Sequence, residues 1–379
     1  MADVYLLTLA LALGIAVLAT IGLQALSSRR RWQRLFYARG PRERPRWGGV
    51  AIFLSFALTP FVASALSGHA AELFEPRSGD FLGFLFAAFM ILLVGMFDDL
   101  RVATPLQKLA VQVAAGAAVY AAGYSIERVG LPWGPELSLG WVAAPVTVIW
   151  IVFFTNAVNL IDGRDGVALG VAVLAAVTLA AIGGHAHHPT VALLLVAIAG
   201  AGLGFLPWNL PPASLYIGDS GALLLGFLLG SLGIRATTGP TDAVFVAVTV
   251  IALGFPLLDA ALAAVRRLLD RRHPFGRDED HIHDRLEAYG FGPRGLLVVI
   301  WGLSVLFSGA ALLLHYIDWF VSEAMVLLGF IVVVTLVLSR LGYVVTLWNS
   351  HSVVWLRRRL IPDAGRSGSD PPARRDHPA

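Results

Sequence analysis

Long apolar stretches, separated by short polar segments, occupy most of this chain. Most of them approach the roughly 20 residues that an α-helix needs to cross the hydrocarbon core of a bilayer. The pattern therefore predicts an all-α integral membrane protein, a polytopic bundle of about eleven transmembrane helices with ten as the alternative. The stretches fall near residues 3–26, 48–67, 81–97, 105–123, 141–157, 167–183, 189–206, 220–235, 241–265, 294–314 and 320–343.

Two segments lie outside this helical pattern. Residues 124–140 hold two short alternating stretches around Pro132-Trp-Gly-Pro135, which predict a small periplasmic hairpin. The sequence from residue 361 onward is rich in Pro, Gly, Ser, Arg and Asp, a composition typical of disorder. We therefore expect a single transmembrane domain over residues 1–360 and a disordered cytoplasmic tail over residues 361–379.

Lysine and arginine lie almost entirely on one side of the predicted topology. Eight arginines fall between Arg29 and Arg46, and another basic cluster spans residues 266–294. Because the positive side of a multi-pass protein faces the cytoplasm, we expect a cytoplasmic C-terminus and a periplasmic N-terminus. The sequence pI of about 9.4 comes mostly from these same arginines, which we expect to lie beside anionic lipid headgroups. It therefore does not indicate a nucleic-acid partner.

Composition supports this class and excludes one kind of site. The 379 residues are 57% hydrophobic and 14% charged, as expected of a chain surrounded mainly by lipid. The absence of cysteine excludes disulfides and thiolate-bound metals.

A dense polar segment, Asn156-Ala-Val-Asn-Leu-Ile-Asp-Gly-Arg-Asp-Gly166, lies between two apolar stretches. It holds two amides, two carboxylates, an arginine and two glycines, and such polar atoms are costly to desolvate at a membrane boundary. Carboxylate and amide oxygens suit a hard divalent cation, and glycines let the backbone approach a phosphate. The segment therefore predicts a place where Mg²⁺ and a phosphorylated substrate meet.

Three further polar clusters interrupt the apolar stretches. They are Phe97-Asp-Asp-Leu-Arg101, Tyr216-Ile-Gly-Asp-Ser-Gly221 and residues 266–289. Two predicted crossings separate each cluster from the next, which places all four polar segments on the cytoplasmic side. Ordinary solvated loops would distribute such residues over both sides equally. The shared side therefore predicts one composite site.

Alternatives stay open for the individual residues of these clusters. Asp98 and Asp99 suit cation binding or an oriented general base, but two acids can also simply end a hydrophobic helix in water. Lys108 is the only lysine and suits a pyrophosphate contact, with retention by chance as the alternative. Asp219 fits either a carboxylate presented by a shaped loop or a plain helix N-cap.

The last cluster contains two histidines at alternate positions. In an extended loop, His281 and His283 would face the same way and bind phosphate or sugar hydroxyls. Zinc, with His273 as a third ligand, is the alternative. Asp259 shares a helical face with Arg266 and is either the ion-pair partner of that arginine or a carboxylate of the site.

Together these segments resemble the bacterial polyprenyl-phosphate N-acetylhexosamine-1-phosphate transferases of glycosyltransferase family 4. The matching stretches span residues 45 to 286 in the family's order. They are Pro45-Arg-Trp-Gly-Gly49, Gly95-Met-Phe-Asp-Asp99, Lys108 with Gln112, residues 156–166, 209–221 and 256–267, and His281-Ile-His-Asp-Arg-Leu286.

The resemblance implies a multi-pass enzyme of the bacterial inner membrane with a cytoplasmic active site. Such an enzyme transfers N-acetylhexosamine-1-phosphate, in the first instance GlcNAc-1-phosphate, from a UDP-sugar to undecaprenyl phosphate and releases UMP. The lipid-linked product would start an envelope glycan such as O-antigen. The resemblance also implies Mg²⁺, with Mn²⁺ as a substitute, and a homodimer.

The resemblance implies a role for individual residues as well. Catalysis is expected of Asp98, Asp99 and Lys108, and metal binding of Asn159 and Asp219. Substrate or nucleotide binding is expected of Asn156, Asp162, Asp165, Arg46, His281, His283 and Arg285.

Two positions depart from the family's pattern. The family usually has a histidine where Asp284 stands and an apolar residue where Arg164 stands. Asp284 replaces a donor with an acceptor, and Arg164 adds charge beside the nucleotide position. We therefore expect this segment to treat its substrate differently from the family.

Three other functions are alternatives. Within the same chemistry, the chain is compatible with the phospho-MurNAc-pentapeptide transferase of peptidoglycan synthesis. Tyr216-Ile-Gly-Asp219 also resembles the Gly-Asp motif of diaspartyl intramembrane proteases, which need two aspartates inside the membrane and no metal. A transporter would place its ionisable groups near the midplane rather than on one side.

Overall fold

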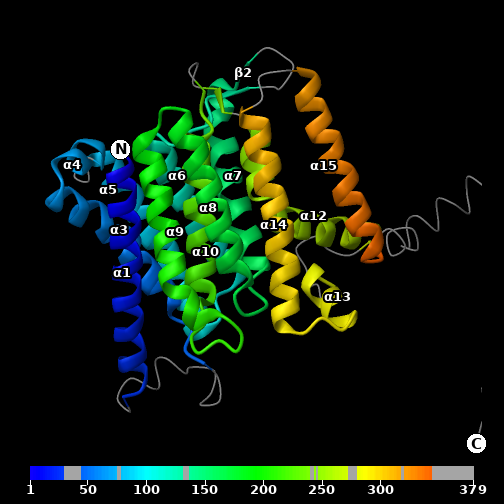
Figure 1. Ribbon diagram of the computed structural model, residues 1–379, viewed down its shortest axis with the longest axis horizontal. Coiled ribbons are helices and arrows are strands. Elements are labelled where there is room, and N and C mark those ends of the chain that lie inside the picture. Colours follow the sequence, from blue (N-terminus) through cyan, green and yellow to red (C-terminus); the bar gives the residue numbers. More distant parts are fainter. Residues whose placement is uncertain are drawn as a thin grey trace, which may run out of the picture.

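Apolar segments in a bilayer must satisfy their backbone hydrogen bonds internally, and here they do so as helices. The computed structural model describes residues 1–29, 44–74, 78–130, 136–239, 243–244, 246–271, 280–316 and 320–343. Most helices run along one axis, and a small sheet covers one end of the bundle (Figure 1). The elements are α1 Ala2–Ser27, α3 Gly48–Leu66, α4 Gly68–Phe74, α5 Gly79–Arg101, α6 Pro105–Ala121, β1 Arg128–Val129, β2 Leu137–Ser138, the 3₁₀ turn η1 Gly140–Val142, α7 Ala143–Leu160, α8 Val167–His185, α9 Pro189–Asn209, α10 Gly218–Ala236, β3 Ala243–Val244, α11 Val246–Ala252, α12 Gly254–Leu269, α13 Ile282–Ala288, α14 Pro293–Tyr316 and α15 Phe320–Arg340.

Within the described residues, eight helices are long and apolar enough to cross a membrane, and a bent pair brings the number to nine. The prediction of an all-α multi-pass membrane protein is thereby confirmed. Helices α6 and α15 coincide with two further predicted stretches, near residues 105–123 and 320–343. The total of eleven crossings and their orientation stay predictions. The predicted tail over residues 361–379 lies outside the described residues.

The predicted crossing near residues 241–265 is not one continuous helix in the structure. This stretch forms α11 and α12, which are bent by 88° at Leu253. Pro256 lacks a backbone N–H and is tolerated in the first turn of a helix, which is where α12 places it. Gly254 leaves no room for a Cβ against the ring of Phe307. As a result, α12 lies across the bundle axis (Figure 1).

Helix α10 is the centre of the bundle. Over an apolar stretch of 18 residues in α10, 89% of the residues are buried, whereas the share is 22% over a stretch of the same length in the peripheral α1. Gly226 and Gly230 let α7 approach, because a Cβ at either position would collide with Phe154. Gly49 of α3 and Gly95 of α5 meet the first turn of α10 in the same way. Such small residues allow close backbone packing between membrane helices, so three helices converge on α10.

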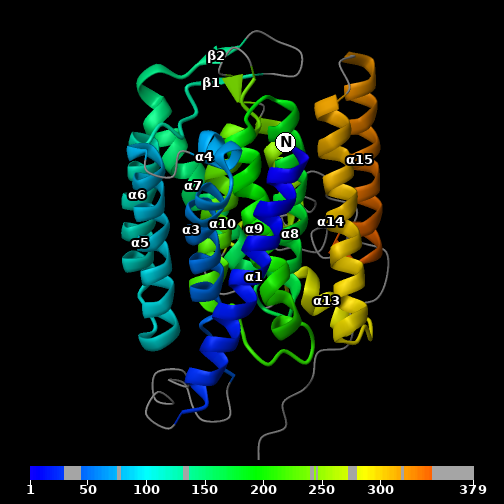
Figure 2. The ribbon, with the colours of Figure 1, turned by 60° about the vertical axis from the view of Figure 1, so that its left-hand side comes forward.

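The predicted antiparallel pairing of two short strands is confirmed, and its periplasmic side stays a prediction. β1 pairs antiparallel with β2, with Arg128 opposite Ser138 and Val129 opposite Leu137. β3, which the sequence pattern did not indicate, pairs in parallel with β1 in the sheet order β2-β1-β3. Figures 1 and 2 place this sheet at one end of the bundle and α13 at the other, which we call the site end.

We predict that Gly95→Ala lowers the free energy of unfolding by about 1–3 kcal/mol, the usual cost of overpacking. The added Cβ would meet the backbone of Ser220, which cannot move without shifting α10. Thermal unfolding of the detergent-solubilised protein measures the effect. Gly302→Ala is the matched control, because nothing lies within 4 Å of a Cβ there. Equal melting temperatures for the two variants would contradict the prediction.

Candidate active site

Two aspartates and the only lysine of the chain meet at the site end of α5, α6 and α10. Lys108 Nζ donates to Asp98 Oδ2 over 2.8 Å and lies 3.4 Å from Asp219 Oδ2. Asp98 is buried, whereas the Lys108 side chain is 23% exposed. The ammonium group is therefore held between two carboxyl groups while part of the side chain stays accessible to a ligand.

The connection between α5 and α6 orients these groups. Val102 ends α5 in the left-handed region, with φ 59°, and its N–H donates to the carbonyl of Asp98. The next N–H, of Ala103, donates to Asp98 Oδ1 over 2.6 Å. Thr104 then starts α6 with a capping box, which places Lys108 one turn into the helix and opposite Asp98. Both oxygens of Asp98 are consequently bound before any substrate arrives.

Asp99 contacts the start of α10. Its Oδ1 accepts from the N–H of Asp219 over 3.0 Å, and its Oδ2 accepts from the N–H of Ser220 over 3.1 Å. These N–H groups have no intrahelical acceptor, and an acidic group is favoured at the positive end of a helix dipole. Gly218, with φ 68°, permits the approach, because a Cβ there would collide with the Asp99 carboxyl. Asp99 thus caps α10 from another helix and fixes the backbone that carries Asp219.

The oxygen atoms around Asp219 suit a hard cation. The side chains of Asn159, at the end of α7, and Asp98 both lie within hydrogen-bonding reach of the Asp219 carboxyl. Among the residues that the structure describes, no three acidic or histidine side chains form a closed metal cage. Mg²⁺ usually takes one or two carboxylates and completes its shell with phosphate oxygens and water. The oxygens present therefore fit a cation that is shared with a phosphorylated substrate.

Asp162 faces this cluster from the loop of residues 161–166, which we call the acidic loop. Burial raises the pKa of the Asp162 carboxyl well above its usual value, and the charges of Asp219 and Asp99 raise it further. The Arg46 guanidinium acts in the opposite direction. The Asp162 carboxyl therefore interacts electrostatically with Asp219 and Asp99, and its role in the site stays a prediction.

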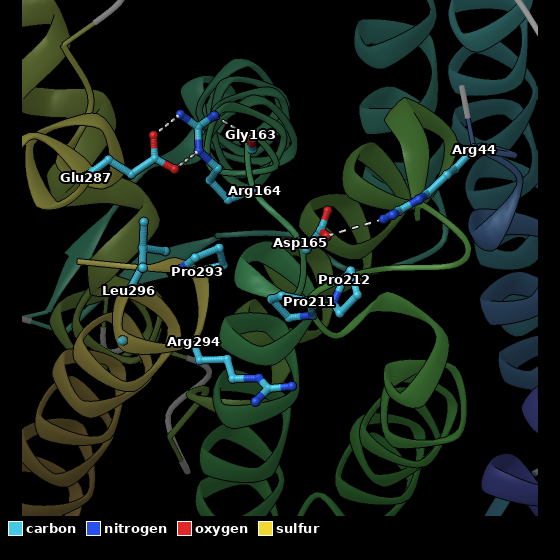
Figure 3. Close-up of a pocket in the computed structure, with 12 residues that line it drawn as sticks. Arg44, Gly163, Arg164, Asp165, Pro211, Pro212, Glu287, Pro293, Arg294 and Leu296 are labelled. Carbon is cyan, nitrogen blue, oxygen red and sulfur yellow. Dashed lines mark hydrogen bonds and ion pairs between the residues drawn. The ribbon is translucent and has the colours of Figure 1, made fainter. Parts of the chain in front are cut away.

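The second half of the acidic loop lines a cavity of about 610 Å³ (Figure 3). Asp165 Oδ2 accepts from the N–H of Ala213 over 2.8 Å and lies 3.7 Å from a guanidinium nitrogen of Arg44. The volume lies within the range of small-molecule sites. The lining residues are Arg44, Gly163, Arg164, Asp165, Pro211, Pro212, Glu287, Gly292, Pro293, Arg294, Gly295 and Leu296.

Two amide side chains brace the acidic loop and its neighbours. Asn209 accepts from the N–H of Gly166 and donates to the carbonyl of Leu215, both over 3.2 Å. Asn156 donates to Gln112 Oε1 over 2.7 Å and so ties α7 to α6. Neither Asn209 nor Arg44 was predicted as a site residue, although Asn209 begins the matching stretch 209–221 and Arg44 directly precedes the stretch that starts at Pro45. Nucleotide binding by Asn156 stays a prediction.

His281 is the N-cap of α13 and has an extended backbone, but His283 lies in the first turn of that helix, so the prediction of an extended loop around both histidines is wrong. Asp284 accepts from the N–H of His281 and thereby caps a short helix. The two rings nevertheless lie parallel, with centroids 5.5 Å apart. Asp259 of α12 anchors the pair, because its Oδ2 lies 2.6 Å from His281 Nδ1 and its Oδ1 accepts from the N–H of Ile282.

The remaining charged groups of α13 differ in their surroundings. Burial lowers the pKa of His283, whose ring lies against Gly163 of the acidic loop. Arg285 binds Asp280 and the carbonyl of Leu341, and its guanidinium stacks on Tyr343 at 3.8 Å. That arginine is therefore engaged with the end of α15, and its predicted substrate contact stays a prediction.

Comparison with known proteins identifies the class of protein. Residues 81–237 match the model of glycosyl transferase family 4. The chain is 32% identical over 271 residues to the probable undecaprenyl-phosphate N-acetylglucosaminyl 1-phosphate transferase of Bacillus subtilis, which covers 71% of this chain and 73% of that protein. It is 31% identical over 291 residues to the decaprenyl-phosphate N-acetylglucosaminephosphotransferase of Mycobacterium tuberculosis, covering 69% and 71%. The phospho-N-acetylmuramoyl-pentapeptide-transferase of Limosilactobacillus fermentum is 35% identical over 201 residues, covering 50% and 59%.

The helical bundle and these relatives define a multi-pass membrane phosphotransferase. The chain belongs to glycosyl transferase family 4, the polyprenyl-phosphate sugar-1-phosphate transferases, and the resemblance seen in its sequence is confirmed.

We predict that Asp99→Asn destabilises the protein by about 1–3 kcal/mol, because an amide can accept only one of the two N–H bonds and leaves the other buried donor unsatisfied. Asp219 should shift with the start of α10, so transferase activity should fall with stability. Thermal unfolding and turnover are measured on the same preparation. Asp165→Asn is the control for the unfolding measurement alone, since Asp165 accepts from one backbone N–H in the described residues and is more exposed. A stable but inactive Asp99→Asn protein would contradict the capping role.

Proposed function

We propose that the protein transfers N-acetylhexosamine-1-phosphate, in the first instance GlcNAc-1-phosphate, from a UDP-sugar to undecaprenyl phosphate. An oxygen of the lipid phosphate attacks the sugar-bearing phosphorus of the donor, the P–O bond to the α-phosphate breaks, and UMP leaves. The observation that carries this proposal is the position of Lys108 between Asp98 and Asp219, of which Asp219 also interacts electrostatically with Asp162 of the acidic loop.

The chain's own residues would neutralise the meeting of two anionic phosphates. Lys108 is a compact cation and binds phosphate as a point charge. Asp98 holds Lys108 in place, since its Oδ2 accepts from the ammonium and its Oδ1 is already bound to Ala103. Preorganised charges of this kind stabilise a developing anion without reorganisation during the reaction.

Asp219 and Asn159, with Asp98 nearby, are the residues that would hold Mg²⁺ or Mn²⁺. Such an ion polarises phosphoryl oxygens and stabilises the leaving phosphate. Asp162 and Asp165 lie on the two sides of the acidic loop, one toward this cluster and one toward the cavity. We assign the cavity to the donor nucleotide because its volume suits a small molecule and the cationic side chains of Arg44 and Arg294 line it.

The second candidate is phospho-MurNAc-pentapeptide transfer. It is favoured by one observation, the 35% identity over 201 residues to a transferase of that name. We prefer the N-acetylglucosamine donor because the relatives named for it match this chain over a greater length. In either case we propose a site on the cytoplasmic face of a bacterial inner membrane, since donor nucleotides are cytoplasmic and the sequence on the predicted cytoplasmic side is rich in arginine. The product would then start an envelope glycan such as O-antigen.

We predict that the purified protein, given undecaprenyl phosphate, Mg²⁺ and a panel of UDP-sugars, releases UMP with a UDP-N-acetylhexosamine and not with UDP-glucose. EDTA should abolish release, and added Mg²⁺ or Mn²⁺ should restore it, because the cluster around Asp219 lacks a full set of protein ligands. Release only with UDP-MurNAc-pentapeptide would favour the second candidate. No release with any UDP-aminosugar would overturn the proposal.

We predict that Asp98→Asn lowers turnover about a hundredfold at both pH 6 and pH 9, the scale of loss expected when a catalytic group is misplaced. The lipid phosphate has a second pKa near 6 and is largely ionised above it, so no strong base is needed. Loss of the ion pair with Lys108 would lower turnover equally at both pH values. A much larger loss at pH 6 than at pH 9 would show instead that Asp98 removes a proton.

A further inference from the structure

A charged bridge joins the acidic loop to α13. Arg164, in the acidic loop, lies 3.1 Å from Asp284 of α13. The same guanidinium donates to both oxygens of Glu287, with Nε to Oε1 at 2.6 Å and Nη2 to Oε2 at 2.7 Å (Figure 3). Planar paired contacts of this type are the geometry for which arginine, unlike lysine, is suited. One added cation in the loop thus meets two carboxylates of the helix.

These contacts join the two segments that carry the predicted substrate contacts. The acidic loop holds Asp162 and Asp165, and α13 holds His281 and His283. At the point of contact, Gly163 lies under the ring of His283, and a Cβ there would lie only 2.9 Å from Nε2. The loop and the imidazole therefore touch without space between them. Any displacement of α13 from the loop would change the position of that ring.

Asp284 connects the bridge to the helix itself. Its Oδ2 accepts from the N–H of His281 and caps α13, while its Oδ1 accepts from Arg164 and lies 3.4 Å from His283 Nε2. Because α13 has only seven residues, its own hydrogen bonds are too few to make it stable alone. Its position must come from outside anchors, and on the side of the acidic loop that anchor is Arg164.

The charge of the bridge also affects the cavity wall. Arg164 and Glu287 both line the cavity that we assign to the donor. Arg164 holds the pKa of Glu287 below its usual value through their hydrogen bonds, so Glu287 stays ionised at neutral pH. The guanidinium of Arg164 already donates to the carboxylates of Glu287 and Asp284. It is therefore poorly placed to serve as a phosphate ligand.

We propose that Arg164 is a positioning residue, which holds the histidines of α13 against the acidic loop through its bridge to Glu287 and Asp284. This inference rests on the proposed transferase function. In this chain the arginine and the two acids act as one unit. Losing one partner should release α13 locally, without unfolding the transmembrane bundle.

The test compares Arg164→Gln, Glu287→Gln, Arg164→Glu and the charge exchange Arg164→Glu with Glu287→Arg. Each single variant should lower kcat about tenfold or more, since small misplacements of catalytic groups cost one to two orders of magnitude. Arg164→Glu should lose the most, because it places three acids together. The charge exchange should recover most of the kcat. Recovery on exchange is a result that a merely space-filling role for Arg164 would not produce.

Hydrogen exchange of residues 282–288 provides a readout that does not depend on activity. Exchange should quicken in each single variant and slow again in the charge exchange, while the melting temperature changes little. Arg128→Gln is the matched control, because Arg128 pairs at 4.0 Å with an exposed glutamate in the sheet at the opposite end. It should change neither kcat nor the exchange of residues 282–288.

Two results would overturn the proposal: unchanged exchange in α13 when Arg164 is replaced, or a charge exchange no better than Arg164→Glu alone. The wild-type protein is assayed first with the UDP-sugar panel. If it releases no UMP, the proposed transferase function fails. The exchange data would still show whether Arg164 holds α13.

Discussion

The start of a buried helix needs acceptors for its first N–H groups, and in this protein Asp99 supplies them to α10 from a neighbouring helix. Helix α10 is the most buried of the spanning helices that the structure describes, and its first turn carries Asp219. Gly49 and Gly95 bring α3 and α5 into backbone contact with the same turn. The position of the central carboxylate therefore follows from a single packed junction of three helices.

The rest of the site is arranged around this junction by helix ends. Asp98 and Lys108 flank the turn between α5 and α6, Asn159 ends α7, and the acidic loop precedes α8. Helix ends carry backbone groups without intrahelical partners, so polar side chains and ligands gather there at little cost. A transferase that brings two phosphates together at a membrane surface can use such ends, because they lie at the boundary between lipid and water.

The sequence predicted the convergence of this site but only part of its contacts. Counting crossings was enough to predict Asp98, Lys108, Asp162 and Asp219 on one side. Two crossings return the chain to the same side of the membrane, however the helices pack. The bend at Leu253 had a local signal in Pro256, which the apolar pattern outweighed. The cap that Asp99 makes on α10, by contrast, joins residues 120 positions apart. No local pattern distinguishes a carboxyl group that binds a cation from one that caps a distant helix.

The histidines of α13 show the same limit. Alternation placed them on one side, and the parallel rings agree, but the cap formed by Asp284 makes a helix where an extended loop was expected. Arg164 and Asp284 each looked like an isolated departure from the family, since their contact is visible only in three dimensions.

The surroundings of Asp98 and Asp219 also argue against proteolysis. A diaspartyl protease needs two carboxyl groups that share a proton and activate a water between them. Here Lys108 lies within 3.4 Å of both acids, and Asp98 has both oxygens bound, one by that lysine and one by the Ala103 N–H. The same lysine is well placed to neutralise phosphate, so the pair fits phosphoryl transfer and not peptide hydrolysis.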